Sequence, residues 1–216
     1  MRPRQTSTET KPASAVGRPR GFDVDQALDR ALLVFWRKGF VAASISDLTE
    51  AMGINRPSLY ATFGNKESLL RRALERYFQG PSSYLQEALR HKTTLDVARQ
   101  ILLGIVDLIS AGNTPPTCLW VHSAMSCGDL SDPLAMEFAH QRRAGLAALR
   151  ARFERGVLEG ELPVSTDAAT LAQFLQTVNV GLSVQGATGA TRQELMAVVN
   201  QTLSTWPRQN RRKQKV

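Results

Sequence analysis

Cysteine, histidine and long apolar runs are scarce in this chain of 216 residues. Its two cysteines, Cys118 and Cys127, are too few for the disulfide framework of a small secreted domain, so we expect a reducing, cytoplasmic location. The three histidines and the two cysteines show none of the spacings typical of metal ligands. The sequence therefore predicts no metal site and no cofactor.

Two further absences narrow the class of protein. No apolar stretch approaches the ~20 residues that cross a bilayer, and the N-terminus lacks the apolar core of a signal peptide, so we expect no membrane contact. The chain also lacks a P-loop, a dinucleotide-binding glycine motif, Gly-x-Ser-x-Gly and His-Glu-x-x-His. These absences argue against an enzyme.

Positive charge is concentrated at the two ends of the chain. The net charge is +8, but residues 1–20 and 207–216 together carry nine net positive charges, which leaves −1 for residues 21–206. We expect residues 1–19 to form a disordered basic arm and residues 207–216 a disordered basic tail. Basic ends favour a polyanionic partner such as nucleic acid, although a solubilising tail is an equally good interpretation of the C-terminal end.

Between these ends, apolar residues recur at helical spacing and nowhere alternate as in a strand. The pattern predicts an all-α protein divided by glycine and proline. The expected helices are residues 23–38, 44–52, 55–63, 66–78, 84–90, 94–111, 118–127, 133–158, 166–187 and 191–206.

The two short helices joined at Gly53, with the first helix packed across them, predict a helix-turn-helix unit. Asn55 is the natural N-cap of the second short helix, and Pro57 is tolerated in its first turn. Such a helix start offers backbone N–H groups to phosphate, and Arg56 has the fork that reads guanine. On this pattern alone, DNA binding and a helical hairpin without a ligand are both open.

Residues 18–70 resemble the DNA-binding domain of the TetR family of transcriptional regulators, in its broad TetR/AcrR sense. The similar stretches are GRPRGFDVDQALDRALLVFWRKGFVAAS, ISDLTEAMGI and NRPSLYATFGNKESLL. The chain departs from the family at Ala43, where a Thr is common. The resemblance implies a homodimeric repressor that binds pseudo-palindromic operator DNA through a three-helix helix-turn-helix domain, residues 20–66. It also implies a larger C-terminal helical domain for ligand binding and dimerisation, residues 67–206.

The resemblance assigns roles to the residues of the reading helix and its surroundings. Base-facing positions are Asn55, Arg56, Pro57, Ser58 and Leu59, and phosphate-facing positions are Ser44, Tyr60, Thr62 and Lys66. Arg18 and Arg20, just before the first helix, are expected to reach phosphate or the adjacent minor groove as a flexible arm. A solvated arm without a fixed contact is the alternative.

The resemblance further implies that an unidentified small-molecule inducer binds the larger domain. An adaptable, mostly apolar set with a polar handle suits such a ligand. The expected pocket residues are Phe78, Tyr84, Cys118, Val121, His122, Met125, Phe153 and Phe174. Core packing is the alternative for each of them.

The last two predicted helices carry wide apolar stripes with small residues, which suits close helix packing. We expect them to pair with the same helices of a partner as a four-helix bundle. The expected interface residues are Leu171, Leu175, Val178, Leu182, Leu195, Val198, Val199 and Leu203.

Cys118 supports an alternative mode of sensing. CLWVHSAMSCGDLSDP resembles a stretch in family members that sense oxidants or electrophiles through a cysteine at the start of this helix. A helix N-terminus lowers the pKa of a thiol, whereas an inert buried cysteine is the competing interpretation. Cys127 would lie ~13 Å away along the helix, beyond disulfide reach. A DNA-binding protein without any ligand is a third alternative.

Overall fold

The computed structural model describes residues 21–126 and 133–209, and all regular secondary structure in those two ranges is helical. The helices are α1 (Val24–Ala42), α2 (Ile45–Met52), α3 (Arg56–Phe63), α4 (Lys66–Gln79), α5 (Tyr84–Ala88), α6 (Thr94–Ser110), α7 (Leu119–Ser126), α8 (Pro133–Leu158), α9 (Ala168–Ala187) and α10 (Arg192–Ser204). The all-α prediction is confirmed.

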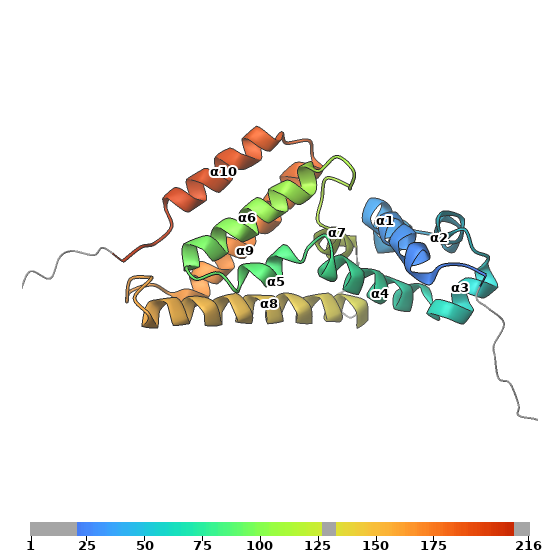
Figure 1. Cartoon of the computed structure of the whole chain (residues 1–216), viewed down its shortest axis with the longest axis horizontal. Helices are drawn as coiled ribbons and strands as arrows, with labels where there is room; N and C mark the ends of the chain where they lie inside the picture. The colour runs from blue at the N-terminus through green and yellow to red at the C-terminus, as the bar shows by residue number, and fades with distance from the viewer. Residues whose placement is uncertain (1–20, 127–132, 210–216) are drawn as a thin grey trace, which may run out of the picture.

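Helices α1, α2 and α3 gather at one end of the molecule, with α4 leading away from them (Figure 1). α1 packs across α2 and α4 because Ala27, Leu28, Ala31, Leu32 and Phe35 bury one face of it. This arrangement matches the predicted helix-turn-helix unit.

Short-range capping fixes the boundaries of the two short helices. Ser44 and Asp47 form a reciprocal capping box at the start of α2. Gly53 ends α2 in the left-handed conformation, with φ 68°, which a residue without Cβ adopts at little cost. α3 then begins behind Asn55, as the sequence predicts.

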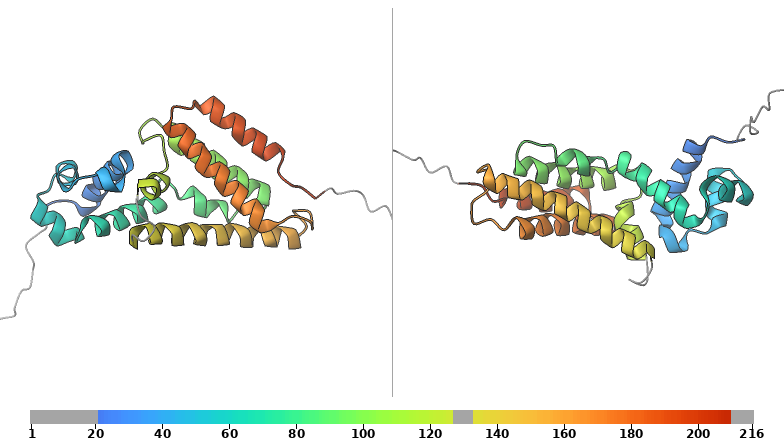
Figure 2. Two further views of the ribbon diagram at one scale, coloured as in Figure 1. Left: turned by 180° about the vertical axis from the view of Figure 1, so that it is seen from behind. Right: turned by 90° about the horizontal axis from the view of Figure 1, so that it is seen from below.

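The remaining helices form the body of the protein (Figure 2). The long helix α8 lies along one side against α9, while α6 contacts α5, α9 and α10. The crossing of α5 and α6 requires Gly104, because a Cβ there would lie 2.2 Å from Cδ2 of the Tyr84 ring. Among the described helices, none is both long enough and apolar enough to cross a membrane.

α4 belongs to both ends of the molecule. It packs on α1 and also contacts α7, through a face that includes Leu70, Leu74 and Tyr77. Arg76 pairs with Asp29 of α1, and Arg71 donates two hydrogen bonds, of 2.8 and 2.7 Å, to Glu137 of α8. The helix therefore connects the helix-turn-helix unit directly to the body.

Four predicted boundaries were wrong by a few residues. The first helix, predicted to end at residue 38, is kinked at Gly39, where φ is 73°, and continues to Ala42. The predicted helix 84–90 ends at Ala88. α9 begins at Ala168, because Asp167 stands before it as the N-cap and accepts from the N–H groups of Ala169 and Thr170. α10 ends at Ser204, so Trp206 packs from the segment that follows the helix.

Candidate DNA-binding surface and body cavity

The first turn of α3 is polar and faces outward. The Asn55 side chain accepts a 2.8 Å hydrogen bond from the Ser58 N–H, which completes the N-cap. Asn55, Arg56 and Pro57 are exposed, and Ser58 is half-buried. The helix start therefore presents small polar groups and backbone N–H groups at the end of the molecule.

Leu59 does not belong to this surface. Its side chain is fully buried, as is nearly all of Phe63 one turn later. The four-residue spacing places both on the side of α3 that packs against the helix-turn-helix core. The sequence-based expectation that Leu59 faces the bases is therefore wrong, whereas Tyr60 next to it is 49% exposed.

Arg56 reaches across to α2. Its Nη2 donates a 2.8 Å hydrogen bond to Ser46 Oγ, and both residues are exposed. A single exposed contact of this kind contributes little stability, so the guanidinium is available for exchange with another acceptor.

The other expected phosphate contacts differ in how they are held. Ser44 Oγ accepts from the Asp47 N–H at 3.1 Å, and Thr62 is half-buried. The Lys66 ammonium donates to the Val41 carbonyl at 3.3 Å and lies 4.5 Å from the centroid of the Phe40 ring. Partial burial lowers the pKa of Lys66.

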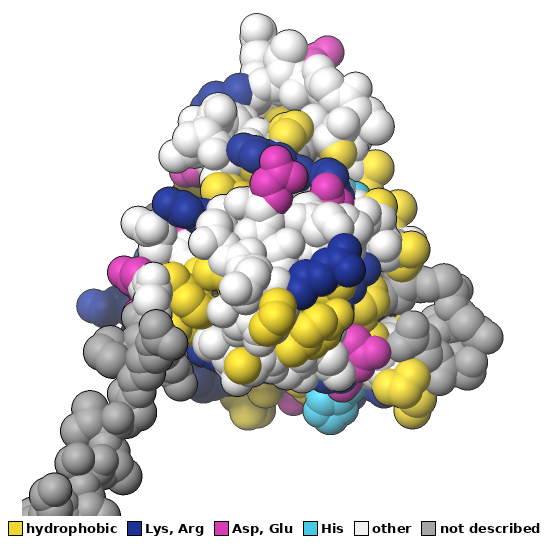
Figure 3. Space-filling view, turned by 90° about the vertical axis from the view of Figure 1, so that its right-hand side faces the viewer, with side chains coloured by type: hydrophobic (Ala, Val, Ile, Leu, Met, Phe, Trp, Pro, Cys, Tyr) yellow, Lys and Arg dark blue, Asp and Glu magenta, His cyan; other side chains and the backbone are white. Residues whose placement is uncertain are grey.

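Charge on this end of the protein is mixed. Residues 21–66 contain five basic and five acidic side chains. Seen from the helix-turn-helix end, Lys and Arg side chains lie in separate groups among uncharged and acidic ones (Figure 3). The two further arginines expected to contact DNA, Arg18 and Arg20, lie outside the described residues.

The body contains a cavity of about 410 Å³ between six helices, α4 to α9. Three of the predicted pocket residues, Phe78, Cys118 and Val121, line it. The middle of α8, around Gly145, is exposed to solvent and also lines the cavity, so the cavity opens along α8.

Five predicted pocket residues do not line this cavity. Met125 is 72% exposed and Phe174 is 45% exposed. Phe153 is buried elsewhere, with its ring 5.5 Å from that of Trp206. His122 Nδ1 lies 3.0 Å from the Trp36 carbonyl oxygen, and Tyr84 is buried against α6. Met125 lies one turn after Val121 on nearly the same face of α7, so its position near the end of the helix, and not the rotation of α7, separates it from the cavity.

Sequence reasoning missed the polar lining. Gln86, Gln141, Arg142, Gln176 and Asn179 all face the cavity. A usable signal was present in α9, where Gln176 and Asn179 interrupt an apolar stripe at helical spacing.

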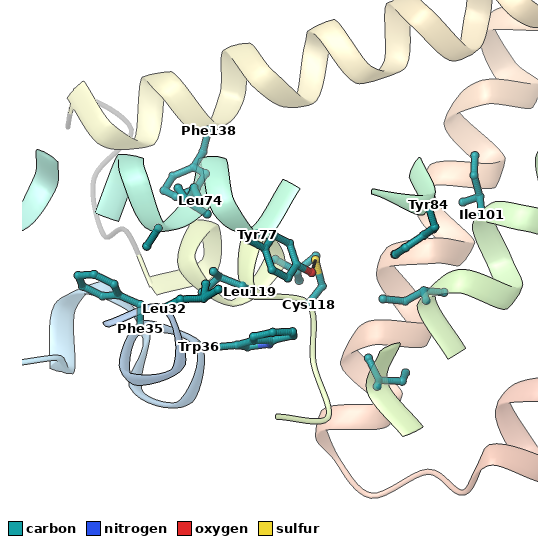
Figure 4. Close-up of a cluster of buried hydrophobic side chains, with 14 of the residues drawn as sticks. Leu32, Phe35, Trp36, Leu74, Tyr77, Tyr84, Ile101, Cys118, Leu119 and Phe138 are labelled. Atoms are coloured by element: carbon teal, nitrogen blue, oxygen red, sulfur yellow. Dashed lines mark hydrogen bonds between the residues drawn. The ribbon is translucent and has the colours of Figure 1, made fainter. Parts of the chain in front are cut away.

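Cys118 is held in a network of buried bonds just before α7. The Tyr77 hydroxyl donates to the Cys118 sulfur at 3.2 Å (Figure 4). The Cys118 N–H donates to Ser183 Oγ at 2.8 Å. Burial raises the pKa of the Cys118 thiol, opposite to the lowering expected at a helix start. A buried, protonated thiol is the unreactive kind, and the other cysteine, Cys127, lies outside the described residues.

The last two helices use much of their apolar surface within the protomer. Leu175, Leu182, Leu195 and Val199 are buried in its own core, so the expectation that they meet a partner is wrong. Of the eight expected interface residues, the other four are half-buried: Leu171, Val178, Val198 and Leu203. Phe174 and Val184 add exposed apolar area on α9.

Residues 27–73 match the family described as "Bacterial regulatory proteins, tetR family". The chain is also 34% identical over 197 residues to the HTH-type transcriptional repressor ComR of Escherichia coli K12, covering 88% of this chain and 92% of ComR. The chain belongs to the TetR family. This TetR-family protein is accordingly a transcriptional regulator and not an enzyme.

Other TetR-family proteins resemble it over a similar length. The repressor BdcR of the same E. coli strain is 29% identical over 190 residues, covering 87% of this chain and 91% of BdcR. The structure of a cysteine variant of the regulator CifR with 26-base-pair operator DNA is 38% identical, with a TM-score of 0.82, and covers 88% of this chain and all of that one. The reduced form of E. coli NemR, at 21% identity and a TM-score of 0.69, shares the fold.

Proposed function

We propose that this TetR-family protein is a homodimeric repressor that leaves a pseudo-palindromic operator when a small molecule enters the body cavity. The observation that carries the DNA-binding part is the exposed, polar first turn of α3, from Asn55 to Ser58, on a buried scaffold. Similarity to ComR and BdcR, both repressors by name, and to the operator-bound CifR structure supports it.

In this proposal residues 20–66 read DNA and residues 67–206 sense and dimerise. Arg56 exchanges Ser46 for a guanine edge, because its fork can satisfy the O6 and N7 acceptors together. The reading helix is positioned on the phosphates, which carry no sequence information themselves, by Tyr60, Ser44, Thr62 and Lys66. For Lys66 this requires its ammonium to leave the Val41 carbonyl or to share it.

The proposed dimer interface uses the apolar area that α9 and α10 leave outside the core. Phe174 and Val184 are exposed on α9, and the half-buried Val178 and Val198 add to them. A symmetric dimer would place two copies of this surface face to face and two α3 helices about 34 Å apart on one side of the DNA.

The turn at Thr117 and Cys118 is the proposed route from the cavity to α3. The Trp36 indole of α1 donates to the Thr117 carbonyl at 2.6 Å, while Ser183 of α9 accepts from the Cys118 N–H. Tyr77 of α4 donates a hydrogen bond to the Cys118 sulfur (Figure 4). Both residues also line the cavity. A ligand that prefers a different arrangement of this turn would shift α1 and α4, and with them the spacing of the reading helices.

Selection of bound duplexes from a random pool tests the DNA-binding part. We expect a two-fold symmetric consensus, and Arg56→Ala should weaken its binding by roughly 5- to 150-fold, as for the loss of a bidentate base contact of about 1–3 kcal/mol. Arg99→Ala removes an exposed arginine from α6 in the body and is the matched control. Equal losses for the two variants, or a consensus without symmetry, would refute the proposal.

A further inference from the structure

We propose that the cavity selects a neutral or anionic, largely apolar ligand with a hydrogen-bond donor, and that it rejects organic cations. The inference rests on the proposed sensing function and narrows the chemistry of its inducer. Three features of the described lining support the inference. It has aromatic and aliphatic walls, it contains one buried acceptor without a hydrogen-bond partner, and it includes no acidic side chain.

The walls favour an apolar, flat skeleton. Tyr77, Phe78 and Trp120 supply aromatic faces, and Leu85, Leu89 and Ile101 supply aliphatic ones. A cavity of about 410 Å³ is within the range of small-molecule sites. Burying a ring against such walls provides most of the binding free energy but little discrimination among ligands.

Asn179 provides the first discriminating group. It is 6% exposed on α9, and its Oδ1 has no hydrogen-bond partner within the described part of the chain. Buried polar atoms are nearly always paired, and an unpaired acceptor on a cavity wall is stabilised by a ligand that brings an N–H or O–H. A ligand without a donor leaves this oxygen unsatisfied.

The charge of the lining provides the second means of discriminating among ligands. Arg142, exposed on α8 at the mouth of the cavity, is the single charged side chain among the described residues that line it. The carboxylates Glu75 and Glu137 line a smaller cavity between α4 and α8 that adjoins the larger one at Phe78, and Glu137 is paired with Arg71. A cation entering the larger cavity would lose its hydration without gaining a counter-charge, whereas an anion gains one in Arg142.

Four naphthalene probes of one shape separate these contributions: 2-naphthamide, 2-naphthoate, 2-naphthylmethylammonium and 2-methylnaphthalene. Their dissociation constants are measured by calorimetry on the full-length protein. We expect the amide to bind roughly tenfold tighter than 2-methylnaphthalene, which corresponds to one good hydrogen bond to a buried acceptor. The amide should also bind tighter than the ammonium, which has N–H donors but would lose its hydration without gaining a counter-charge. The carboxylate should also bind at least about tenfold tighter than the ammonium.

Variants assign each preference to its residue. Arg142→Gln should weaken the carboxylate about five- to tenfold and leave the amide unchanged, whereas the control Arg143→Gln, which does not line the cavity, should change neither. Asn179→Leu should weaken the binding of 2-naphthamide and leave the binding of 2-methylnaphthalene unchanged. Asn179→Asp keeps the size of the side chain and should improve binding of the ammonium, which a purely structural role would not do.

Ala148→Trp fills the cavity from α8 and locates the binding site. We expect it to abolish binding of all the probes that bind the wild type. Tightest binding of the ammonium, lost in Ala148→Trp, would overturn the ligand class and leave the sensing function intact. Binding that persists in Ala148→Trp, or no binding of any probe to a protein that still binds its operator, would overturn the inference together with the inducer site.

Discussion

At the scale of single residues, Asp47 shows how one side chain ties the helix-turn-helix unit together. Its carboxylate pairs with Lys38 of α1 at 2.7 Å and accepts from the Ser44 N–H at 3.0 Å. The hydrogen bond from Lys38 and those from Ser44 lower the pKa of Asp47 to about 2. The carboxylate therefore couples the packing of α1 on α2 to the capping of α2.

This pKa shift predicts a pH-dependent stability. A carboxyl group with a lowered pKa stabilises the fold fully above its ordinary pKa of 3.8, and that stabilisation is lost as the pH falls toward 2. Asp47→Asn should therefore lower the urea midpoint near pH 5, and its difference from the wild type should shrink by about pH 2. Unfolding curves at several pH values measure this.

The exposed Glu50, on the same helix, provides the control for that series. Glu50→Gln should change the midpoint little at either pH. The difference in urea midpoint between Asp47→Asn and the wild type could instead stay constant from pH 5 to about pH 2. That result would show that the ionisation of Asp47 does not contribute to stability.

The sequence predicted local caps correctly, and its predictions failed where a residue's partners come from distant segments. Asn55 as N-cap follows from the residues next to it. The expected lowering of the Cys118 pKa considered only the helix start, whereas burial by residues of other elements outweighs it and raises the pKa. The same reason explains Leu59, whose spacing to Phe63 indicated the core side more reliably than its place in a family motif.

At the scale of elements, the turn before α7 connects α1, α4 and α9 through named hydrogen bonds. Ser183→Ala removes the acceptor of the buried Cys118 N–H, so we expect a loss of about 1–3 kcal/mol in unfolding free energy. The Trp36 indole N–H, bonded to Thr117, should then exchange faster with solvent. Hydrogen exchange followed by NMR measures this.

Ser204→Ala is the matched control, because Ser204 is exposed at the end of α10 and far from this turn in the sequence. It should leave the exchange of the Trp36 indole unchanged. If Ser183→Ala destabilises the protein while that indole exchanges as in the wild type, the turn does not couple α9 to α1.

Helix positions were predictable because glycine, proline and capping residues mark their ends locally. The cavity was not, because six helices build it and the phase of each depends on its neighbours. α7 illustrates this: Val121 lines the cavity, whereas Met125, one turn later on nearly the same face, is 72% exposed. The sequence alone does not distinguish the exposed small residues of α8, such as Gly145, from ordinary surface residues, because the cavity they line also depends on the helices opposite them.

At the scale of the whole molecule, the net positive charge comes from residues 1–20 and 207–216. If the arm before α1 contacts DNA, Arg18→Ala/Arg20→Ala should reduce the slope of log affinity against log salt by up to about 1.8, the value for two phosphate contacts. Operator affinity measured over a salt series gives the slope. The double variant should retain the wild-type consensus sequence.

Arg211→Ala/Arg212→Ala removes the same charge from the C-terminal end and controls for a change in net charge alone. A slope that is unchanged in the Arg18/Arg20 variant, or that falls equally in both variants, would contradict a specific role for the arm.

The surface available for the proposed dimer was the least predictable property at this scale. Two apolar stripes at the end of the chain suggested more surface than one protomer could cover, but α6 and α8 cover much of it, including Leu175 and Val199. The apolar surface that remains exposed, around Phe174 and Val184, is smaller than the sequence pattern suggested. Periodicity identifies a stripe without telling which neighbour occupies it.

The shared position of α4 constrains its length as well as its composition. Lys66 stands at the helix-turn-helix end and Tyr77 at the cavity, about three turns later. One inserted residue between them would rotate the cavity end by about 100° and advance it by about 1.5 Å. Tyr77 would then leave Cys118 while the reading helix stayed in place. Relatives that sense through this cavity should therefore vary in α4 by substitution and keep the number of residues between its two ends.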